Sequence, residues 1–296
     1  MPITDTNFIE QMRAKQNEKF AELMKNIDNK DEAPGRELAV VILAAGLGKR
    51  MKSPDKPKVM FELNGKPMIQ FVIELALNVN AQRIIPIVGN HRQQVIDFVD
   101  NLIPNLPFAD EKGAKAVIEY AIQEKQLGTG HAIMQTEEPL KDFTGNVLIL
   151  SGDVPLLKFE TVERLINEHQ DNDFDATLLT TVFKDATGYG RIVRDSEGMF
   201  LKIVEHKDAT EEEKKINEIN PAIYIAKSNV LFDALHKVTP DNNQNEYYLT
   251  DIFHFIAKEK IGTVVTEDEM EVTGINSIEQ LTEMEKYLNN FQSKLK

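Results

Sequence analysis

A glycine-containing turn crowded with basic residues is the strongest chemical signal in the sequence. LAAGLGKRMKSPDKPKVM, residues 43–60, directly follows an apolar run in a chain whose net charge is −14. Its five basic residues, set against the single acid Asp55, are Lys49, Arg50, Lys52, Lys56 and Lys58. Glycine lets a backbone approach an anion closely, and basic side chains at this spacing can reach the same anion. The pattern therefore favours a triphosphate-binding loop over a surface turn with solvated lysines.

Two familiar phosphate-binding motifs do not fit this turn. A Walker loop needs four residues between its glycines, followed by Lys-Ser or Lys-Thr. A dinucleotide-binding fingerprint needs a third glycine at position 51, where Met51 stands. The loop therefore indicates another class of nucleotide-binding protein.

A second turn, QEKQLGTGHA at residues 123–132, combines amides with small residues. Gln123 and Gln126 offer both hydrogen-bond donors and acceptors, which suits the edge of a pyrimidine base. Taken alone, such glutamines are more often exposed polar residues. Thr129 is able to cap the helix that we expect to follow.

A carboxylate follows a third apolar run, VLILSGDVPL at residues 147–156. Asp153 at the end of this expected strand is a candidate Mg²⁺ ligand, because Mg²⁺ often takes only one or two protein oxygens beside phosphates and water. The alternative is that Asp153 caps a helix expected near residues 158–169.

Composition excludes several other classes of protein. The net charge of −14 argues against a nucleic-acid or membrane-surface binder, which needs a spread basic face. The absence of Cys rules out disulfides, thiolate catalysis and Cys-based zinc sites, and fits a cytoplasmic location. No G-x-S-x-G motif occurs, and the six His residues lack metal-ligand spacing. No apolar run is long enough to span a bilayer.

The elements that must position these residues alternate between strands and helices from Leu38 onward. LAVVILA, RIIPIV and VLIL predict strands, and PMIQFVIELALNV and HRQQVIDFVDNL predict helices between them. The fold class is therefore α/β, a doubly wound, mostly parallel, Rossmann-like sheet with ligands beyond the carboxyl ends of its strands. Residues 175–226 predict a mixed, partly antiparallel extension. Helices near 228–237 and 247–259, the strand GTVVT and a terminal helix follow.

The first 36 residues differ in character from the rest. Residues 1–36 are polar and end in breaker-like residues around Pro34 and Gly35, so we expect a helical extension followed by one domain over 37–296. Phe20, Leu23, Met24 and Ile27 fall at helical spacing. Such a face packs either on the domain or on a partner.

Several further motifs complete a recognisable order. GYGRI, IVEHKDAT, EINPAIYIA, NEYYLTDI and EVTGIN occur at 188–192, 203–210, 218–226, 245–252 and 271–276. Together with the three motifs above, they resemble the uridyltransferase domain of bacterial N-acetylglucosamine-1-phosphate uridyltransferases, also called UDP-N-acetylglucosamine pyrophosphorylases. The resemblance runs from about Leu38 to about Asn276.

The resemblance implies a role for each matching residue. It implies that Arg50 and Lys58 act on the phosphates, and that Asp153 and Asn276 bind Mg²⁺. The implied nucleotide-binding residues are Ala44, Ala45, Gly46, Gly48, Gln123, Gln126, Gly128 and Thr129. The implied residues on the sugar side are Tyr189, Gly190, Glu205, Asn220 and, with weaker support, Lys207.

The implied activity is transfer of UMP from UTP to N-acetylglucosamine 1-phosphate, with release of pyrophosphate. One alternative is a uridyltransferase for glucose 1-phosphate or for several sugar phosphates, and another is a non-catalytic nucleotide-sugar sensor. The expected partners are UTP and a sugar 1-phosphate, with neither nucleic acid nor membrane. We expect a monomer or a weak homo-oligomer.

Three features depart from the family pattern. Lys49 stands where the family usually has Thr, and Pro221-Ala222 stands where Thr-Gly commonly follows the sugar-binding Asn. The second departure bears on sugar preference. The sequence also ends after the terminal helix, without the hexapeptide repeats of the two-function relatives. We therefore expect this chain to lack their acetyl transfer activity.

Overall fold

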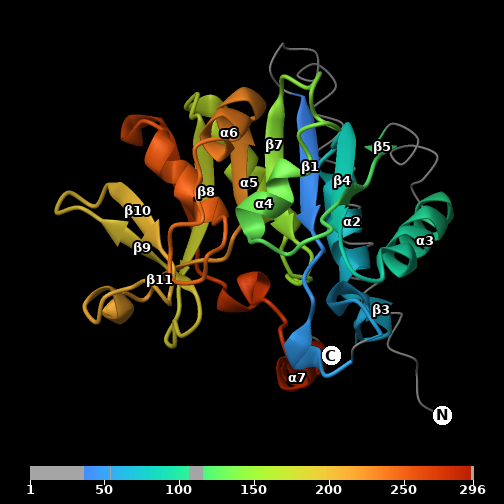
Figure 1. Ribbon diagram of the computed structural model, residues 1–296. Helices are drawn as coiled ribbons and strands as arrows, with labels where there is room; N and C mark the ends of the chain where they lie inside the picture. The colour runs from blue at the N-terminus through green and yellow to red at the C-terminus, as the bar shows by residue number, and fades with distance from the viewer. Residues whose placement is uncertain (1–36, 54, 107–115, 295–296) are drawn as a thin grey trace.

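Buried apolar runs form the centre of the main sheet. The computed structural model describes residues 37–53, 55–106 and 116–294. In it, β1 (Leu38–Leu43) pairs in parallel with β4 (Arg83–Val88) on one side and with β7 (Asn146–Ser151) on the other (Figure 1). Continuous apolar runs are typical of parallel strands that are covered on both faces.

Helices cover both faces of this sheet. Val40 and Ile42 face one cluster of buried side chains, and Ala39 and Val41 face the other. The first face carries α2 (Met68–Asn78), α3 (Arg92–Leu102) and α5 (Phe159–Asp171). The second carries α4 (Thr129–Met134), α6 (Ser228–Leu235) and the 3₁₀ helix η6 (Leu249–Phe255). The prediction of a doubly wound α/β sheet is confirmed.

An antiparallel region extends the sheet, as the sequence predicts. Its strands are β8 (Ala176–Val182), β9 (Gly190–Arg194), β10 (Phe200–Val204), β11 (Glu218–Asn220) and β12 (Tyr224–Lys227). β12 joins them to β7, and β13 (Ile261–Thr266) adds to β8 in parallel. The order β10-β9-β11-β8-β12-β7-β1-β4-β5 places the antiparallel strands on one side of β7 and the parallel strands on the other.

Short elements shape the loops around this framework. The short strands are β2 (Glu62–Leu63), β3 (Lys66–Pro67), β5 (Val117–Ile118) and β6 (Ala121–Ile122). The remaining 3₁₀ helices are η1 (Lys49–Met51), η2 (Lys58–Met60), η3 (Ile103–Asn105), η5 (Glu213–Lys215), η7 (Lys258–Lys260) and η8 (Glu269–Val272).

The segment expected to be a helix near residues 247–259 forms 3₁₀ helices rather than an α-helix. Its β-branched and aromatic residues lose side-chain freedom in an α-helix. In addition, the N–H of Leu249 donates outside the segment, to Thr129 Oγ1 at 3.2 Å. This stretch is therefore shaped by its contact with the turn before α4.

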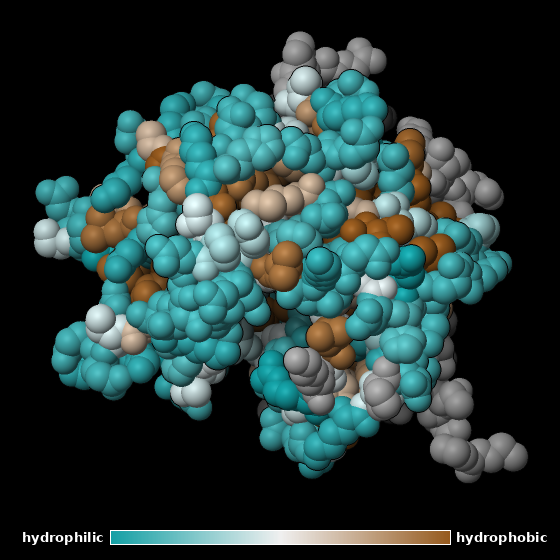
Figure 2. Space-filling model, in the orientation of Figure 1, coloured by the Kyte–Doolittle hydropathy of each residue, from teal (hydrophilic) through white to brown (hydrophobic). Residues whose placement is uncertain are grey.

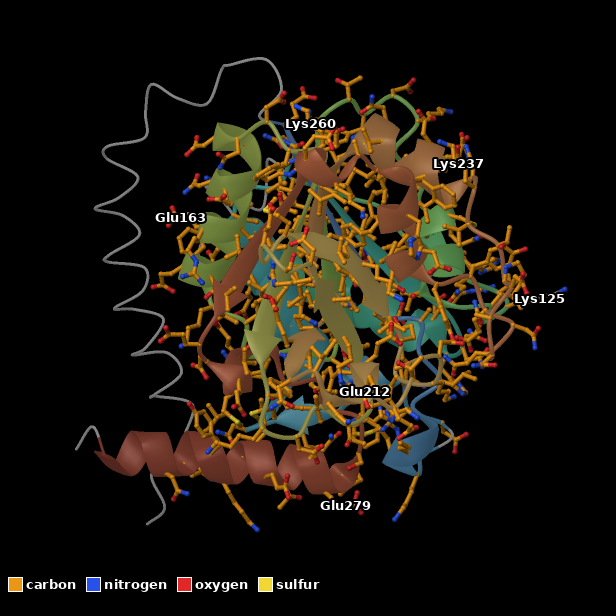
Figure 3. The ribbon with its side chains drawn as sticks, turned by 90° about the vertical axis from the view of Figure 1, so that its left-hand side faces the viewer. Lys125, Glu163, Glu212, Lys237, Lys260 and Glu279 are labelled. Atoms are coloured by element: carbon orange, nitrogen blue, oxygen red, sulfur yellow. The ribbon has the colours of Figure 1, made fainter. Side chains whose placement is uncertain are left out.

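The terminal helix, α7 (Ile278–Lys294), packs on the β2–β3 hairpin. Leu63, Met68, Ile275 and Met284 form a small buried cluster between them. Figure 3 shows α7 along the base of the molecule. Within the described ranges, no helix combines the length and the apolar character that crossing a membrane would require. The expected helical extension, residues 1–36, lies outside the described residues.

Candidate active site

The loop after β1 approaches the Lys58 segment closely. Ala44 continues the strand direction, with its N–H donating to Ile87 O at 3.0 Å. Gly48 has a φ of 58°, and a Cβ there would lie 2.9 Å from Lys58 Cβ. Glycine meets both demands because it has no Cβ. This glycine therefore allows the loop after β1 and η2 to lie side by side.

Lys58 joins two oxygen-bearing side chains from distant parts of the chain. Its Nζ forms an ion pair with Asp153 Oδ2 and donates to Asn276 Oδ1 at 2.6 Å. Asp153 follows β7, and Asn276 precedes α7. The N–H of Ile275 donates to Asp153 O at 2.9 Å, which fixes the two loops together. The N-cap residue of α5 is Lys158. Asp153 therefore does not cap this helix, and its side chain contacts Lys58 instead.

This ion pair differs from the ordinary surface charges. Figure 3 shows Lys125, Glu163, Lys237 and Lys260 projecting outward from the ribbon. By contrast, the side chains of Lys58 and Asp153 are only 13% and 20% exposed. Screening by solvent weakens exposed pairs most, so the charges of Lys58 and Asp153 are screened less than those of a typical surface pair.

A buried carboxylate holds the segment that carries Asn276. Glu271, in η8, is 2% exposed. It accepts hydrogen bonds from Thr161 Oγ1 at 2.9 Å and from the Lys158 N–H at 3.3 Å. Both partners belong to the start of α5, which follows the Asp153 loop. The segment from Glu271 to Asn276 is thereby held against the loop that bears Asp153.

The oxygen pair has the chemistry of a divalent cation site. Asp153 Oδ2 and Asn276 Oδ1 converge on one ammonium group, so both point at a position that suits a positive charge. Mg²⁺ prefers oxygen ligands and keeps several sites for phosphates and water. Among the described residues no group of three or more His, Cys, Asp or Glu could hold a metal. A two-oxygen site completed by substrate is the arrangement that these residues fit.

A cavity of about 370 Å³ lies beside this pair. Such a volume is in the range of small-molecule sites. The predicted site residues that line it are Ala45, Gly46, Lys58, Gln123, Gln126, Gly128, Thr129 and Asp153. Ala44, Gly48 and Arg50 do not line it, and Arg50 is exposed. The loop after β1, here called the phosphate loop, the turn at residues 123–132, here called the amide turn, and Asp153 thus meet at one cavity.

The amide turn is clamped to the segment that precedes η6. Gly128 has a φ of 111°, and a Cβ there would lie 2.5 Å from Tyr247 O. The Gly130 N–H donates to this carbonyl at 2.8 Å. Gln123 is 4% exposed, and its Nε2 lies 3.0 Å from Gly128 O and 3.1 Å from His131 Nδ1. Gly128, rather than Thr129, is the N-cap residue of α4.

Two predicted sugar-side residues lie side by side on antiparallel strands. Gly190 in β9 pairs with Asn220 in β11. Asn220 Nδ2 donates to the Tyr224 hydroxyl at 2.6 Å, and its Oδ1 accepts from the Ala222 N–H at 3.0 Å. Ala222 lines the cavity and has a φ of 60°, a left-handed conformation that favours glycine. Asn220 is therefore tied both to the sheet and to the cavity wall.

The other predicted sugar-side residues are dispersed. Glu205 follows β10 and accepts from Thr250 Oγ1 at 3.2 Å; burial raises the pKa of Glu205, and the Thr250 hydrogen bond opposes that rise. Burial also raises the pKa of Tyr189, and the nearby charge of Asp153 adds to that rise. Lys207 is exposed and contacts Gln244. Tyr189 thus lies near the Asp153 pair.

The structure adds residues that the sequence did not single out. Gly89 follows β4, and a Cβ there would lie 2.9 Å from both Ala45 O and Gln126 Nε2. A glycine directly after an apolar strand, as at Gly46, is the signal that could have found it. Glu246 lines the cavity, and Tyr247 supports the amide turn. Both lie in NEYYLTDI, a motif used above only for resemblance.

The face of the molecule drawn in Figure 2 is mostly polar. Figure 2 shows hydrophilic residues over most of the visible face, with apolar residues in separate groups between them.

Comparisons with known sequences show the family of the chain. A family model described as nucleotidyl transferase matches residues 39–273. The chain is 46% identical over 254 residues to the bifunctional protein GlmU of Caldanaerobacter subterraneus subsp. tengcongensis, covering 85% of this chain and 52% of that protein. It is 44% identical over 245 residues to GlmU of Picosynechococcus sp., covering 83% and 51%. The chain spans about half the length of these curated relatives.

A solved structure of similar shape is UDP-glucose pyrophosphorylase complexed with UDP-glucose. The TM-score is 0.68, with 86% of this chain and 99% of that chain covered, at 19% identity. At this identity the likeness concerns the fold alone.

Proposed function

Because the chain belongs to the nucleotidyl transferase family, we propose that it transfers UMP from UTP to N-acetylglucosamine 1-phosphate and releases pyrophosphate. The observation that carries this proposal is the meeting of Lys58, Asp153 and Asn276 beside the cavity that the phosphate loop and the amide turn line. A cation-binding oxygen pair next to such a loop suits a reaction between two phosphates.

In this proposal no protein side chain acts as a nucleophile. An oxygen of the sugar phosphate attacks the α-phosphorus of UTP, the new P–O bond forms, and pyrophosphate leaves with the electrons of the broken bond. Catalysis then consists of positioning the anions and neutralising charge that develops on the leaving group. Lys58 and Arg50 are the candidate groups for that charge. Asp153 and Asn276 would hold Mg²⁺, which when bound supplies further positive charge at the phosphate oxygens.

The two ends of the cavity are proposed to bind the two substrates. Ala45, Gly46 and Gly48 offer close backbone approach to the UTP phosphates, and Gln123 and Gln126 offer amides to uracil. Gly128 and Thr129 shape the turn around the base, and Ala44 connects the loop to β1. On the other side, Gly190, Glu205 and Asn220 are proposed to contact the sugar, with Tyr189 and Lys207 as further candidates. The position of Ala222 on the cavity wall supports a sugar site there.

A coupled pyrophosphate assay tests the proposal directly. UTP, CTP, ATP and GTP are each combined with N-acetylglucosamine 1-phosphate and glucose 1-phosphate, with Mg²⁺ present. We expect the highest kcat/KM for UTP with N-acetylglucosamine 1-phosphate. A preference for glucose 1-phosphate would favour the alternative sugar. Absence of pyrophosphate with every pair, from protein that still binds UTP, would indicate the sensor instead.

We further propose that residues 37–296 form the catalytic unit in a cytoplasmic enzyme, as a monomer or weak homo-oligomer. Deleting residues 1–36 should leave kcat within about threefold, because no proposed site residue lies there. The measurement is kcat together with the molecular mass in solution. Loss of activity together with a change in the number of associated chains would show that Phe20, Leu23, Met24 and Ile27 complete a core or an interface.

A further inference from the structure

A histidine on α4 contacts the side chain proposed to read the base. His131 Nδ1 lies 3.1 Å from Gln123 Nε2, and Gln123 lines the cavity. His131 itself is not among the residues that line the cavity. Its ring also lies near the Tyr247 ring, with centroids 6.3 Å apart. His131 is therefore placed to act through Gln123 rather than on a substrate directly.

The contacts fix which end of the Gln123 amide is which. A backbone carbonyl only accepts hydrogen bonds, so the atom 3.0 Å from Gly128 O must be the nitrogen of the amide. One hydrogen of this nitrogen goes to Gly128 O, and the other points to His131 Nδ1. Nδ1 accepts it only if His131 is neutral, with its proton on Nε2. Burial lowers the pKa of His131, which favours that neutral form.

We propose that His131 is a positioning residue that makes Gln123 present only its carbonyl oxygen to the base. The inference rests on the proposed function, in which the base is uracil. Uracil has a single donor on its base-pairing edge, N3–H. An amide that can only accept must therefore read this N3–H. Cytosine has an acceptor at N3, which would face Gln123 Oε1 without a hydrogen bond, so the arrangement selects against CTP.

Two substitutions of His131 separate positioning from simple packing. Asn places an oxygen acceptor near the position of Nδ1, so His131→Asn should keep the amide oriented. Leu has similar bulk without an acceptor, so His131→Leu frees one amide hydrogen while Gly128 O still holds the other. The Gln123 amide can then offer its oxygen to UTP or its freed hydrogen to CTP. Both variants leave Lys58, Asp153 and Asn276 untouched.

The test measures the ratio of dissociation constants for UTP and CTP by calorimetry, alongside the ratio of kcat/KM. In His131→Leu both ratios should fall by roughly tenfold, the value of one hydrogen bond together with an unpaired buried group. In His131→Asn they should stay near wild type. 5-Methyl-UTP is the internal control, because it keeps N3–H and its ratio to UTP should not change in either variant.

The outcomes distinguish this inference from the proposed function. A folded His131→Leu protein with unchanged UTP/CTP ratios overturns the inference. The proposed function still stands in that case if the wild type turns over UTP. Equal binding of UTP and CTP by the wild type also overturns it. Collapse of the binding ratio in His131→Leu, in a protein that releases no pyrophosphate, supports the inference and defeats the function. A His131→Asn variant as unselective as His131→Leu would assign His131 a packing role only.

Discussion

The two sides of the proposed site are built differently. On the parallel side, Lys58, Asp153 and Asn276 all come from loops and short helices beyond the strands. On the antiparallel side, Gly190 and Asn220 belong to paired strands of the sheet itself. The first group makes contacts between charged or strongly polar side chains. Asn220 instead bonds the buried hydroxyl of Tyr224 and the backbone of Ala222.

This difference predicts that substitutions on the two sides affect activity and stability to different extents. A loop side chain that is partly exposed can change its charge with little cost to packing, whereas a buried strand residue also holds the sheet together. Substitutions on the parallel side should therefore change metal and phosphate chemistry more than stability. Substitutions on the antiparallel side should change both. The following experiments test that division, from the largest expected effect to the smallest.

Asp153→Asn should lower kcat by about 10²-fold or more, because the amide keeps the shape but loses the charge proposed to hold Mg²⁺. The thermal midpoint should fall only slightly, because Asn276 Oδ1 still accepts from Lys58 and the amide keeps the packing of the carboxylate. The measurements are kcat as a function of Mg²⁺ concentration and a melting curve. Near-normal turnover at limiting Mg²⁺ would contradict the assignment of Asp153.

The stability that comes from the contact of α5 with β7 and β8 should depend on pH. His169 on α5 is 1% exposed and lies 3.0 Å from Thr177 Oγ1 in β8 and 3.1 Å from Asn146 Oδ1 in β7. Burial lowers the pKa of His169 from 6.5 to about 4. The unfolded chain therefore binds the extra proton first as pH falls. The free energy of unfolding should decrease from about pH 6.5 to about pH 4, by on the order of 3 kcal/mol from this group.

Urea unfolding at several pH values checks this dependence. In His169→Gln the contribution of this residue between pH 6.5 and 4 should vanish, although the variant is less stable overall. An equally steep loss of stability in wild type and His169→Gln would mean that other groups control the acid response. The active-site residues should not affect this comparison, because the hydrogen-bond partners of His169, Thr177 and Asn146, lie outside the proposed site.

Lys58→Met should bind a divalent cation more tightly in the absence of nucleotide. The Lys58 ammonium now engages both oxygens that would ligate the metal, so removing it removes a competitor. We expect the dissociation constant of Mn²⁺, measured by electron paramagnetic resonance, to fall by roughly tenfold, or about 1.4 kcal/mol. Lys52→Met is the control, because Lys52 is 77% exposed and its charge is screened.

One outcome of the Mn²⁺ measurement would contradict the shared cation position. If Lys58→Met binds Mn²⁺ no better than Lys52→Met does, Asp153 and Asn276 do not share one cation position with Lys58. Turnover should still fall in Lys58→Met, because the proposed leaving-group charge is lost.

Ala222→Gly should have the smallest effect and should bear on the sugar side. The φ of 60° at Ala222 costs an L-residue about 1–2 kcal/mol, partly offset by the greater freedom of glycine in the unfolded chain. The free energy of unfolding should therefore rise by about 1 kcal/mol or less. Asn245→Gly, at a φ of 51°, should gain less because Asn tolerates this conformation better.

The same variant probes sugar selection. Ala222 lines the cavity, so loss of its methyl group changes the wall proposed to face the sugar. Together with Pro221→Thr, which restores a backbone donor, it should raise the preference for N-acetylglucosamine 1-phosphate by roughly threefold to tenfold. An unchanged ratio of kcat/KM would remove Pro221-Ala222 from the account of specificity.

The sequence alone predicted the fold class and the strand ends that matter. The apolar runs LAVVILA, RIIPIV and VLIL are confirmed as parallel strands. Loops that follow these strands line the cavity. Local pattern suffices there because a strand buried on both faces must be apolar throughout. It did not suffice for residues 247–259, where contact with Thr129 decides the backbone form.

Only the tertiary structure decided which side chains share a cavity and in what state. Asp153 and Asn276 are far apart in the chain, and no spacing rule shows that both turn to Lys58. Nor does a sequence reveal that Gly128 O and His131 together occupy the Gln123 amide, or that Ala222 adopts a glycine-like conformation. Residue types are local properties of the chain, whereas the direction of a side chain and its hydrogen-bonding partner depend on what the fold packs against it.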